Sequence, residues 1–245
     1  METPAILSTM SKIIARKLNE LNAMPDRALE KSLEVLHLPP LTREEIEFIS
    51  QRGMRMRYLK NTVLITEGDI GDQIYFILKG RVKAFTDDGE GKSVILSVQG
   101  PGEYFGELAA IDACPRSCSV MTIEQTEISV VTHDVFEACL LERPEIALRF
   151  LSALTGRIRD MTEVVKSLAL DNVYGRIVRV LEKLSVEGEN GQKLTARLTQ
   201  QEIAEMVGAS RVMVGKIMKD LVAGGFIESA EDRHYIIHKP LPRHW

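Results

Sequence analysis

The spacing of hydrophobic residues changes twice along this 245-residue chain, from helical to strand-like and back again. Apolar side chains recur every three to four residues in the segment 5–22, which predicts an amphipathic helix within an N-terminal extension, residues 1–41. Packing of this helix on its own protein or on a dimer mate is favoured over binding to a membrane surface or another partner. Thr42 and Glu45 have capping-box spacing, so a second helix is expected to run to about Ser50.

Between Tyr58 and Val131 the apolar residues follow short β-rich runs instead. These runs read TVLIT, QIYFIL, RVKAFT, SVILSV, SCSVMTI and EISVV, and most are separated by turns that contain glycine. This spacing predicts a compact antiparallel barrel or roll, which we place at residues 42–143 together with a helix at Asp134–Leu141.

A long helix is expected to begin at Pro144 and to span residues 144–168, because proline suits the first helical turn. Its apolar residues form two series with a spacing of seven, the pattern that pairs helices in a coiled coil. We expect a parallel homodimer, and the alternative is a helix that packs on its own barrel. The residues assigned to the dimer interface are Leu151, Leu154, Ile158, Met161, Val165 and Leu168, and Ala147 continues the second series.

Residues 169–245 form the last predicted domain. A helix over 171–184 is followed by a turn at Gly188–Gly191 and by the strand candidate KLTARL. Near the C-terminus, FIES and HYIIH indicate a β-hairpin, with a turn at 230–233.

Two short helices separated by a glycine turn lie between these strands. Thr199 and Glu202 form a capping box for the first, Gly208 marks the turn, and Ser210 caps a second helix that reaches Leu221. This is the pattern of a helix-turn-helix, whose second helix enters the major groove of DNA, and the hairpin would be its wing. A solvated structural helix pair is the alternative.

The start of the second helix offers groups that read base edges. Arg211 suits guanine O6 and N7, Lys216 reaches a base edge or a phosphate, and Val212 matches a thymine methyl group. The residues that we assign to DNA binding are Thr199, Gln200, Ser210, Arg211, Val212, Met213 and Lys216.

The segment FGELAAIDACPRSCS, residues 105–119, contains several groups that can bind a phosphate and a ribose. Gly106 precedes a short predicted helix, whose N-terminus favours an anion. Arg116 supplies a forked guanidinium, and Ser117 adds a hydroxyl group. Glu107 would be repelled by a phosphate unless it accepts a hydrogen bond from a ribose hydroxyl. A loop with a surface Glu107–Arg116 salt bridge is the alternative.

This segment resembles the phosphate-binding cassette of the cyclic-AMP receptor protein (CRP/FNR) family, which cyclic-nucleotide-regulated kinases share. The pattern FGE(L)A followed by PR(S/A) is complete here, and TxQEIAxxVGxSRxxVxxIxxxL at 199–221 is similar to the family's helix-turn-helix. The resemblance covers about residues 45–240. It implies an α+β chain with an N-terminal antiparallel β-roll, a long dimerisation helix and a C-terminal winged helix-turn-helix domain.

The resemblance also implies a ligand site. Glu107 would take the ribose hydroxyl, while Arg116, Ser117 and backbone amides take the cyclic phosphate. Base contacts would come from the long helix, where Thr162 aligns with a serine that the dimer partner supplies. The expected ligand-binding residues are Gly106, Glu107, Leu108, Ala109, Arg116, Ser117, Met161 and Thr162.

Two positions depart from the family pattern. Met161 replaces a threonine that meets the base, which leaves the identity of the base open. Val212 replaces a glutamate that accepts from cytosine N4, so a different operator is expected.

The composition narrows the classes of protein to which this chain can belong. With 44% hydrophobic and 27% charged residues the chain is typical of a globular protein, and no run approaches the roughly 18 apolar residues of a membrane span. Lys12, Arg16 and Lys17 interrupt the N-terminal apolar pattern, unlike a signal peptide, so we expect a cytoplasmic protein that has no membrane partner.

Charge and cysteine usage add little to this picture. The net charge is −4, but residues 171–245 carry 11 Lys and Arg against 10 Asp and Glu, so the acidic excess lies before the predicted DNA-binding region. Cys114, Cys118 and Cys139 have neither disulfide-framework nor zinc-site spacing, and we expect reduced packing residues and no metal.

Together these patterns predict a homodimeric, allosteric transcription regulator that binds a pseudo-palindromic site in double-stranded DNA and contacts RNA polymerase. Cyclic AMP is the expected effector; cyclic di-GMP, cyclic GMP or no effector are the alternatives, and activation versus repression stays open. An enzyme that acts on phosphodiesters lacks any metal or nucleophile motif, so no catalytic residue or resident cofactor is expected. A structural coiled-coil adaptor would not explain the cassette and the recognition helix together. Iron–sulfur sensing lacks an N-terminal cysteine cluster, and haem sensing has no support beyond five scattered histidines.

Overall fold

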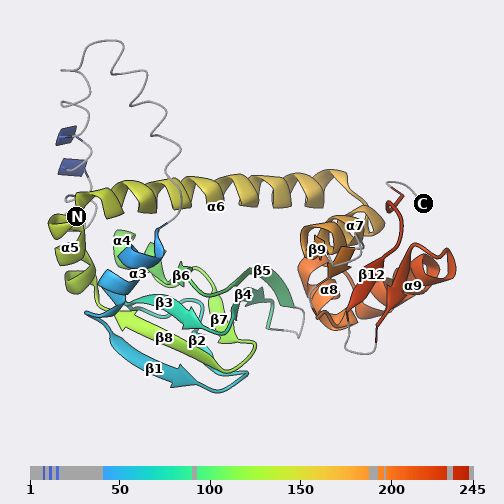
Figure 1. Ribbon diagram of the computed structural model, residues 1–245, viewed down its shortest axis with the longest axis horizontal. Helices are drawn as coiled ribbons and strands as arrows, with labels where there is room; N and C mark the ends of the chain where they lie inside the picture. The colour runs from blue at the N-terminus through green and yellow to red at the C-terminus, as the bar shows by residue number, and fades with distance from the viewer. Residues whose placement is uncertain are drawn as a thin grey trace, which may run out of the picture. The chain divides into compact units, whose positions relative to one another are not determined.

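The computed structural model describes residues 8, 11–12, 15–16, 41–89, 93–187, 193–195, 197–230 and 234–242 (Figure 1). Within the helix predicted for 5–22, the described residues are helical, and the remainder of the N-terminal extension lies outside the described residues. The turn predicted at Gly188–Gly191 and residues 231–233 of the wing turn also lie outside them.

The chain divides into two compact units, 1–85 with 97–159 and 86–96 with 160–245. The first unit contains most of a β-roll and the first part of a long helix, and the second contains the C-terminal domain. None of the described helices is long and apolar enough to cross a membrane.

The roll consists of two four-stranded sheets. The first has the order β1-β8-β3-β6 and the second β2-β7-β4-β5, and the registers of the neighbouring strands described are antiparallel. The predicted roll is therefore confirmed. The strands are β1 (Met54–Tyr58), β2 (Val63–Ile65), β3 (Ile74–Lys79), β4 (Val82–Asp87), β5 (Ser93–Gln99), β6 (Tyr104–Phe105), β7 (Ser119–Thr122) and β8 (Thr126–Val131).

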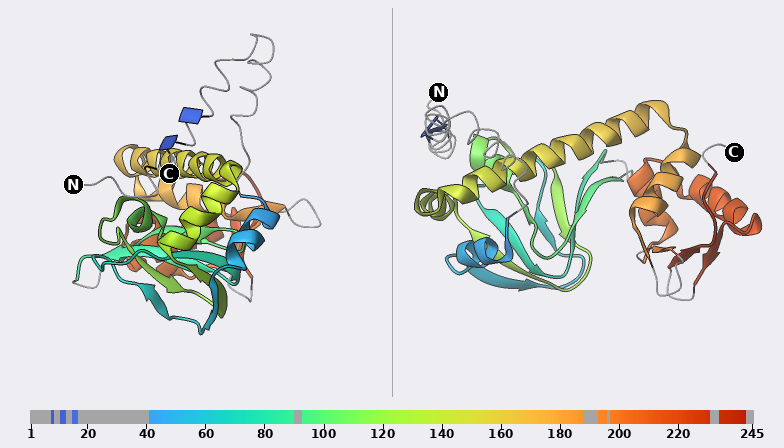
Figure 2. Two further views of the ribbon diagram at one scale, coloured as in Figure 1. Left: turned by 90° about the vertical axis from the view of Figure 1, so that its left-hand side faces the viewer. Right: turned by 45° about the horizontal axis from the view of Figure 1, so that its top comes forward.

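Helices gather at one end of these strands, in the region of α3, α4 and α5 in Figure 1 and in the views of Figure 2. They share one apolar core with the strands, in which Phe76, Phe136 and Phe150 are fully buried. The helices are α3 (Arg43–Ser50), α4 (Glu107–Asp112), α5 (His133–Glu142) and α6 (Pro144–Leu170). The capping box of α3 is confirmed, because Glu45 N donates to the Thr42 hydroxyl and the Glu45 carboxylate accepts from Thr42 N.

The two halves of α6 differ in exposure, and the helix ends two residues beyond the predicted Leu168. Ala147 is buried in the core of the roll, and Leu151 and Leu154 pack partly against it. Farther along, Ile158 and Val165 are 63% and 64% exposed. The apolar residues with sevenfold spacing therefore pack on the core of the roll in the first half of α6 and are exposed in its second half.

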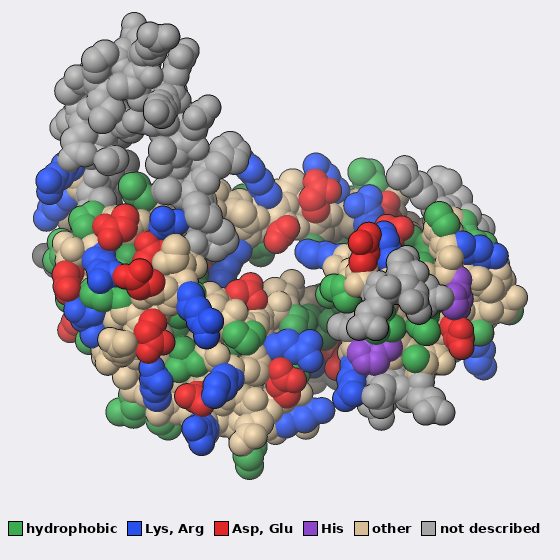
Figure 3. Space-filling model, viewed as in Figure 1, with side chains coloured by type: hydrophobic (Ala, Val, Ile, Leu, Met, Phe, Trp, Pro, Cys, Tyr) green, Lys and Arg blue, Asp and Glu red, His purple; other side chains and the backbone are tan. Residues whose placement is uncertain are grey.

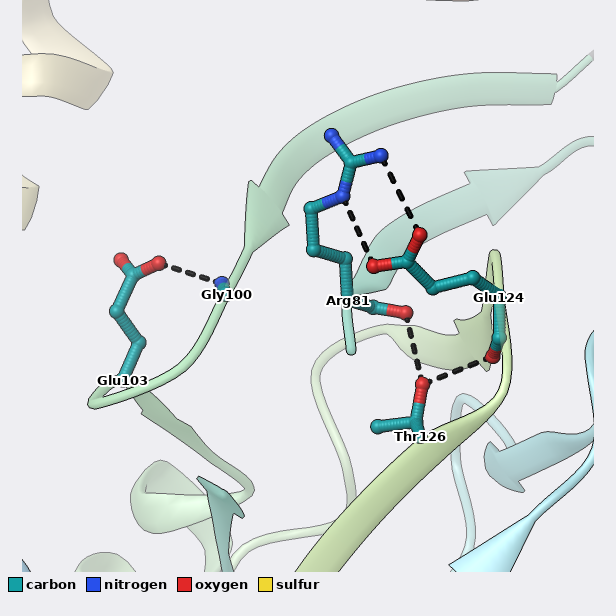
Figure 4. A network of polar contacts seen from close by, with 5 residues as sticks. All are labelled: Arg81, Gly100, Glu103, Glu124 and Thr126. Carbon is teal, nitrogen blue, oxygen red and sulfur yellow. Dashed lines mark hydrogen bonds and ion pairs between the residues drawn. The ribbon is translucent and has the colours of Figure 1, made fainter. Parts of the chain in front are cut away.

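Polar contacts at the strand ends join the turn between β3 and β4 to the turn between β7 and β8, and close the turn between β5 and β6 (Figure 4). The Arg81 guanidinium binds the Glu124 carboxylate at 3.2 and 3.5 Å, and the Thr126 hydroxyl donates to the carbonyl oxygens of both residues. In the turn between β5 and β6, the Glu103 carboxylate accepts from Gly100 N at 2.7 Å. Tyr104 thus follows a turn closed by its own hydrogen bonds.

The C-terminal domain packs three helices against a four-stranded antiparallel sheet of order β11-β12-β10-β9. Ile177, Leu181, Ile203, Val214 and Leu221 are fully buried in its core. The elements are α7 (Val173–Lys183), β9 (Ser185–Glu187), β10 (Lys193–Thr195), α8 (Gln200–Val207), α9 (Arg211–Ala223), β11 (Ile227–Ser229) and β12 (Tyr235–Ile237). The predicted winged helix-turn-helix fold is confirmed, and the wing hairpin belongs to a larger sheet than expected.

Candidate functional site

The cassette forms around the N-terminus of α4, where Gly106 has a positive φ of 80°. The Arg116 side chain is 5% exposed, and it donates to Gly106 O at 2.6 Å and to Gln73 O at 3.0 Å. A Cβ atom at Gly106 would lie 2.8 Å from Arg116 Nη1 and 3.0 Å from Gln73 O. Glycine at 106 therefore supplies both the backbone conformation and the space that the guanidinium needs.

The backbone of Arg116 is held as firmly as its side chain. Arg116 N donates to Asp69 O, and Gly68 N donates to Arg116 O, both at 2.9 Å. The guanidinium donates to the carbonyl oxygens of Gly106 and Gln73, and at 3.5 Å to Gln73 Oε1, so some of its five N–H groups remain for an anion. The arrangement presents a fixed positive charge close to the N-terminus of a helix.

Glu107, the first residue of α4, is 5% exposed and forms an ion pair with Arg157 of α6. Arg157 Nη1 donates to Glu107 Oε1 at 2.5 Å. The sequence left a surface salt bridge between Glu107 and Arg116 as the alternative. The structure shows a different arrangement, because Glu107 pairs with Arg157. Because Arg157 neutralises the buried carboxylate, Glu107 can lie close to a bound phosphate with less repulsion.

Arg157 is a site residue that the sequence analysis missed. Its Nη2 donates to Tyr104 O at 2.6 Å, and its guanidinium carbon lies 4.5 Å from the centre of the Tyr104 ring, which stacks on Phe150. Burial raises the pKa of Tyr104 well above its ordinary value, so the phenol stays neutral. The spacing of Arg157 from Leu154 and Met161, three and four residues, was the available signal for its place beside the helix seam.

The remaining predicted ligand residues differ in exposure. Ala109 is buried against the roll, whereas Leu108 is 48% exposed and Ser117 is exposed beside Arg116. Met161 is 63% exposed, and Thr162 is exposed as well. The structure thus brings Gly106, Glu107, Ala109 and Arg116 together around α4, and places Met161 and Thr162 on the uncovered half of α6.

The helix-turn-helix has the caps that its sequence predicts. Thr199 and Glu202 form the capping box of α8, Gly208 ends that helix with φ 62°, and the Ser210 hydroxyl accepts from Met213 N at 3.3 Å. Gly215 leaves room for the Gln200 side chain of α8, since a Cβ there would lie 3.1 Å from Gln200 Oε1. The first turn of α9 is therefore capped and ordered.

The start of α9 is open to a partner. Arg211 and Lys216 are exposed, and Val212 and Met213 are 84% and 48% exposed. A groove of about 380 Å³ runs beside them, lined by Thr199, Gln200, Arg211, Ser229 and Tyr235 among others. The groove joins the beginnings of both helices to the wing, and three of the predicted DNA-binding residues, Thr199, Gln200 and Arg211, line it.

Charged side chains of both signs mix on the face of the roll seen in Figure 3. Among the part of the chain that the structure describes, no cluster of three or more His, Cys, Asp or Glu could hold a metal ion. Burial raises the pKa of the Cys118 and Cys139 thiols, which agrees with packing residues, but Cys114 is exposed, so the expectation is wrong for Cys114.

Two family models match the chain, a cyclic nucleotide-binding domain at residues 55–143 and a Crp-like helix-turn-helix domain at 175–241. The CRP-like cAMP-activated global transcriptional regulator of Mycobacterium tuberculosis is 32% identical over 168 residues, 67% of this chain and 75% of that protein. The cAMP-activated global transcriptional regulator CRP of Salmonella typhimurium is 30% identical over 186 residues, 74% of this chain and 89% of that protein.

Among solved structures, the c-di-GMP responsive global regulator CLP of Xanthomonas campestris matches with a TM-score of 0.71 and 25% identity. The match covers 81% of this chain and 100% of that one. Cyclic nucleotide-binding and helix-turn-helix domains in one chain define a DNA-binding transcription regulator. This chain belongs to the CRP/FNR family of such regulators, and its relatives named above are regulators rather than enzymes.

Proposed function

We propose that this protein is a homodimeric regulator whose binding to promoter DNA is controlled by cyclic AMP in the roll. The observation that carries the proposal is that a buried guanidinium, Arg116, and a buried carboxylate, Glu107, both lie at the N-terminus of α4, where Arg116 donates to Gly106 O. The relatives from Mycobacterium tuberculosis and Salmonella typhimurium are cAMP-activated, which favours the same effector here.

In this mechanism the cyclic phosphate binds the unused N–H groups of Arg116, the Ser117 hydroxyl and backbone amides at the start of α4. A ribose hydroxyl donates to the free oxygen of the Glu107 carboxylate, whose charge Arg157 balances. Leu108 and Ala109 complete the cassette, and Met161 and Thr162 contact the base.

The second half of α6 is the proposed dimer contact. Ile158, Met161 and Val165 are 63%, 63% and 64% exposed, and pairing with a second copy would remove this apolar stripe from water. Leu168 extends the stripe, while Leu151 and Leu154 already contact the roll. Residues 42–143, 144–168 and 169–245 would then act as sensor, dimer helix and DNA reader.

Each α9 helix of the dimer would enter one major groove, so the operator would be pseudo-palindromic. Base edges would be contacted by Arg211, Val212 and Lys216. The other four residues, Thr199, Gln200, Ser210 and Met213, would support these contacts or reach the DNA backbone. RNA polymerase would be the further partner at a promoter, and the cytoplasm the place of action.

A second candidate effector is cyclic di-GMP, because CLP, a c-di-GMP responsive regulator, shares the fold over 81% of this chain. Cyclic GMP or a constitutive regulator are further alternatives. The complete set of Glu107, Arg116 and Ser117 favours a single ribose with one cyclic phosphate, as in a mononucleotide.

Calorimetric titration with cyclic AMP, cyclic GMP and cyclic di-GMP, together with selection from a palindromic DNA library, tests effector and operator at once. Arg116→Leu should abolish the nucleotide response and leave a folded dimer, whereas Arg55→Leu, which removes an exposed guanidinium elsewhere on the roll, should change neither. Unchanged cyclic AMP affinity in Arg116→Leu would contradict the assignment.

A further inference from the structure

Gln73, the residue before β3, is a half-buried polar residue that contacts Arg116 and has no part in the cassette pattern. Its carbonyl oxygen accepts a hydrogen bond from Arg116 Nη2 at 3.0 Å. Its side-chain Oε1 lies 3.5 Å from the same nitrogen, at the long end of a hydrogen bond. One residue from outside the cassette therefore offers two acceptors to the guanidinium that is assigned to the cyclic phosphate.

The loop that ends at Gln73 also holds the rest of Arg116. Arg116 N donates to Asp69 O, and Gly68 N donates to Arg116 O. Gly71 lies in the same loop, and a Cβ atom there would be 3.0 Å from Arg116 Nη2 and 3.3 Å from Gln73 Oε1. The guanidinium and the Gln73 amide thus pack so closely against Gly71 that even a methyl group would press on both.

The guanidinium also contacts the residues that lead into α4. Its Nη1 donates to Gly106 O at 2.6 Å. Its carbon atom lies 5.8 Å from the centre of the Tyr75 ring, which stacks on Phe105 at 4.9 Å. The carbonyl acceptors belong to the backbone, whereas a single change of side chain removes Gln73 Oε1.

The orientation of the guanidinium matters, because it binds a phosphate through directional, charge-assisted hydrogen bonds. We propose that Gln73 is a positioning residue for phosphate recognition. Its Oε1 restrains Arg116 Nη2, so that the remaining N–H groups are directed at one exocyclic oxygen of the cyclic phosphate. This inference rests on the proposed function, in which Arg116 binds that phosphate.

The Sp and Rp phosphorothioate diastereomers of cyclic AMP test this orientation. Each carries sulfur in place of one exocyclic oxygen, and sulfur is a weaker hydrogen-bond acceptor than oxygen. A guanidinium directed at one oxygen binds more tightly the diastereomer that keeps this oxygen. Calorimetry on the full-length protein gives the dissociation constants of cyclic AMP and of both diastereomers. The ratio of the two diastereomer constants reports orientation separately from overall affinity.

Gln73→Met keeps the length of the side chain and removes the acceptor. We expect the wild-type protein to discriminate between the diastereomers by about tenfold, the equivalent of one charge-assisted hydrogen bond, and Gln73→Met by less than about threefold. The matched control is Gln51→Met, which makes the same chemical change at the exposed C-terminus of α3, where Gln51 contacts Glu47. It should leave the ratio at the wild-type value.

Two further variants separate orientation from the loss of a hydrogen bond. Gly71 does not have a positive φ, so Gly71→Ala is compatible with its backbone, and the added Cβ would displace Arg116 Nη2. It should lower the ratio as Gln73→Met does. Gln73→Glu keeps an acceptor and should keep the ratio. Its carboxylate competes with the phosphate for Arg116, so the affinity for all three ligands should fall by about tenfold.

Thermal denaturation checks that each variant is folded. An unchanged ratio in Gln73→Met, or equal losses of discrimination in Gln73→Met and Gln73→Glu, would overturn the inference while the proposed function stands. A wild-type protein that binds cyclic AMP without distinguishing the diastereomers would have the same consequence. Failure of the wild-type protein to bind cyclic AMP would overturn both.

Discussion

The buried Glu107 carboxylate depends on Arg157 for compensation of its charge. Removing one partner of a buried ion pair leaves the other uncompensated, and the cost is reduced here because the Arg157 side chain is 31% exposed. We expect Arg157→Gln to lower the free energy of unfolding of the roll by about 1–2 kcal/mol. It should also weaken cyclic AMP binding, because an uncompensated carboxylate would repel the phosphate. Urea denaturation and calorimetry measure the two effects.

The matched control for this variant is an ion pair at the surface. Arg55 and Glu47 lie 2.9 Å apart with both side chains 50% exposed, so Arg55→Gln should change stability by less than about 0.5 kcal/mol. Equal effects of Arg157→Gln and Arg55→Gln on stability and on binding would show that Glu107 needs no compensation.

The residue types within one short segment allowed the cassette to be predicted, but not the pairing of its Glu107 carboxylate with Arg157. Gly106, Glu107 and Arg116 lie within eleven residues, so their types and spacing predict an anion site. Arg157 contacts Glu107 and Tyr104 across 50 and 53 residues of sequence. That pairing depends on how α6 packs on the roll, and no local pattern carries this information.

At the scale of elements, α6 contains a glycine in its interior. Gly156 is helical, and a Cβ atom there would meet nothing within 4 Å. Alanine loses less backbone entropy than glycine on helix formation, so Gly156→Ala should stabilise the protein by about 0.5–1 kcal/mol. Thermal denaturation measures the change, and calorimetry should show an unchanged dissociation constant for cyclic AMP. A lower melting temperature would contradict this expectation.

Elements with local signals were predicted and elements without them were missed. The capping boxes of α3 and α8 and the Ser210 cap of α9 are read from residues three apart, and the structure confirms them. The strand β1 has the sequence MRMRY and lies at the edge of its sheet, and four of its residues are exposed. Its residues alternate between apolar and charged, but Met54 and Met56 are 68% and 39% exposed, so the alternation marks no buried face. The strand β6 has only two residues and lies outside the β-rich runs that the sequence predicts.

For the molecule as a whole, sensor and DNA reader are separate packed units with their own cores. Their order along the chain predicted a regulator, because α6 follows the cassette and precedes the helix-turn-helix. Coupling between them requires that the nucleotide bind the DNA-competent arrangement of the dimer more tightly than any other arrangement.

Such coupling is reciprocal, which gives a prediction for the intact protein. If cyclic AMP raises the affinity for operator DNA by some factor, saturating operator must raise the affinity for cyclic AMP by the same factor, typically about 5–150-fold. Titrating nucleotide with and without operator, and operator with and without nucleotide, gives both ratios under one set of salt conditions. Arg116→Leu should bring both ratios to one without unfolding the protein, because it removes the phosphate contact. If the wild-type ratios are also one, the roll does not control the DNA reader, and the proposal of a nucleotide-controlled regulator fails.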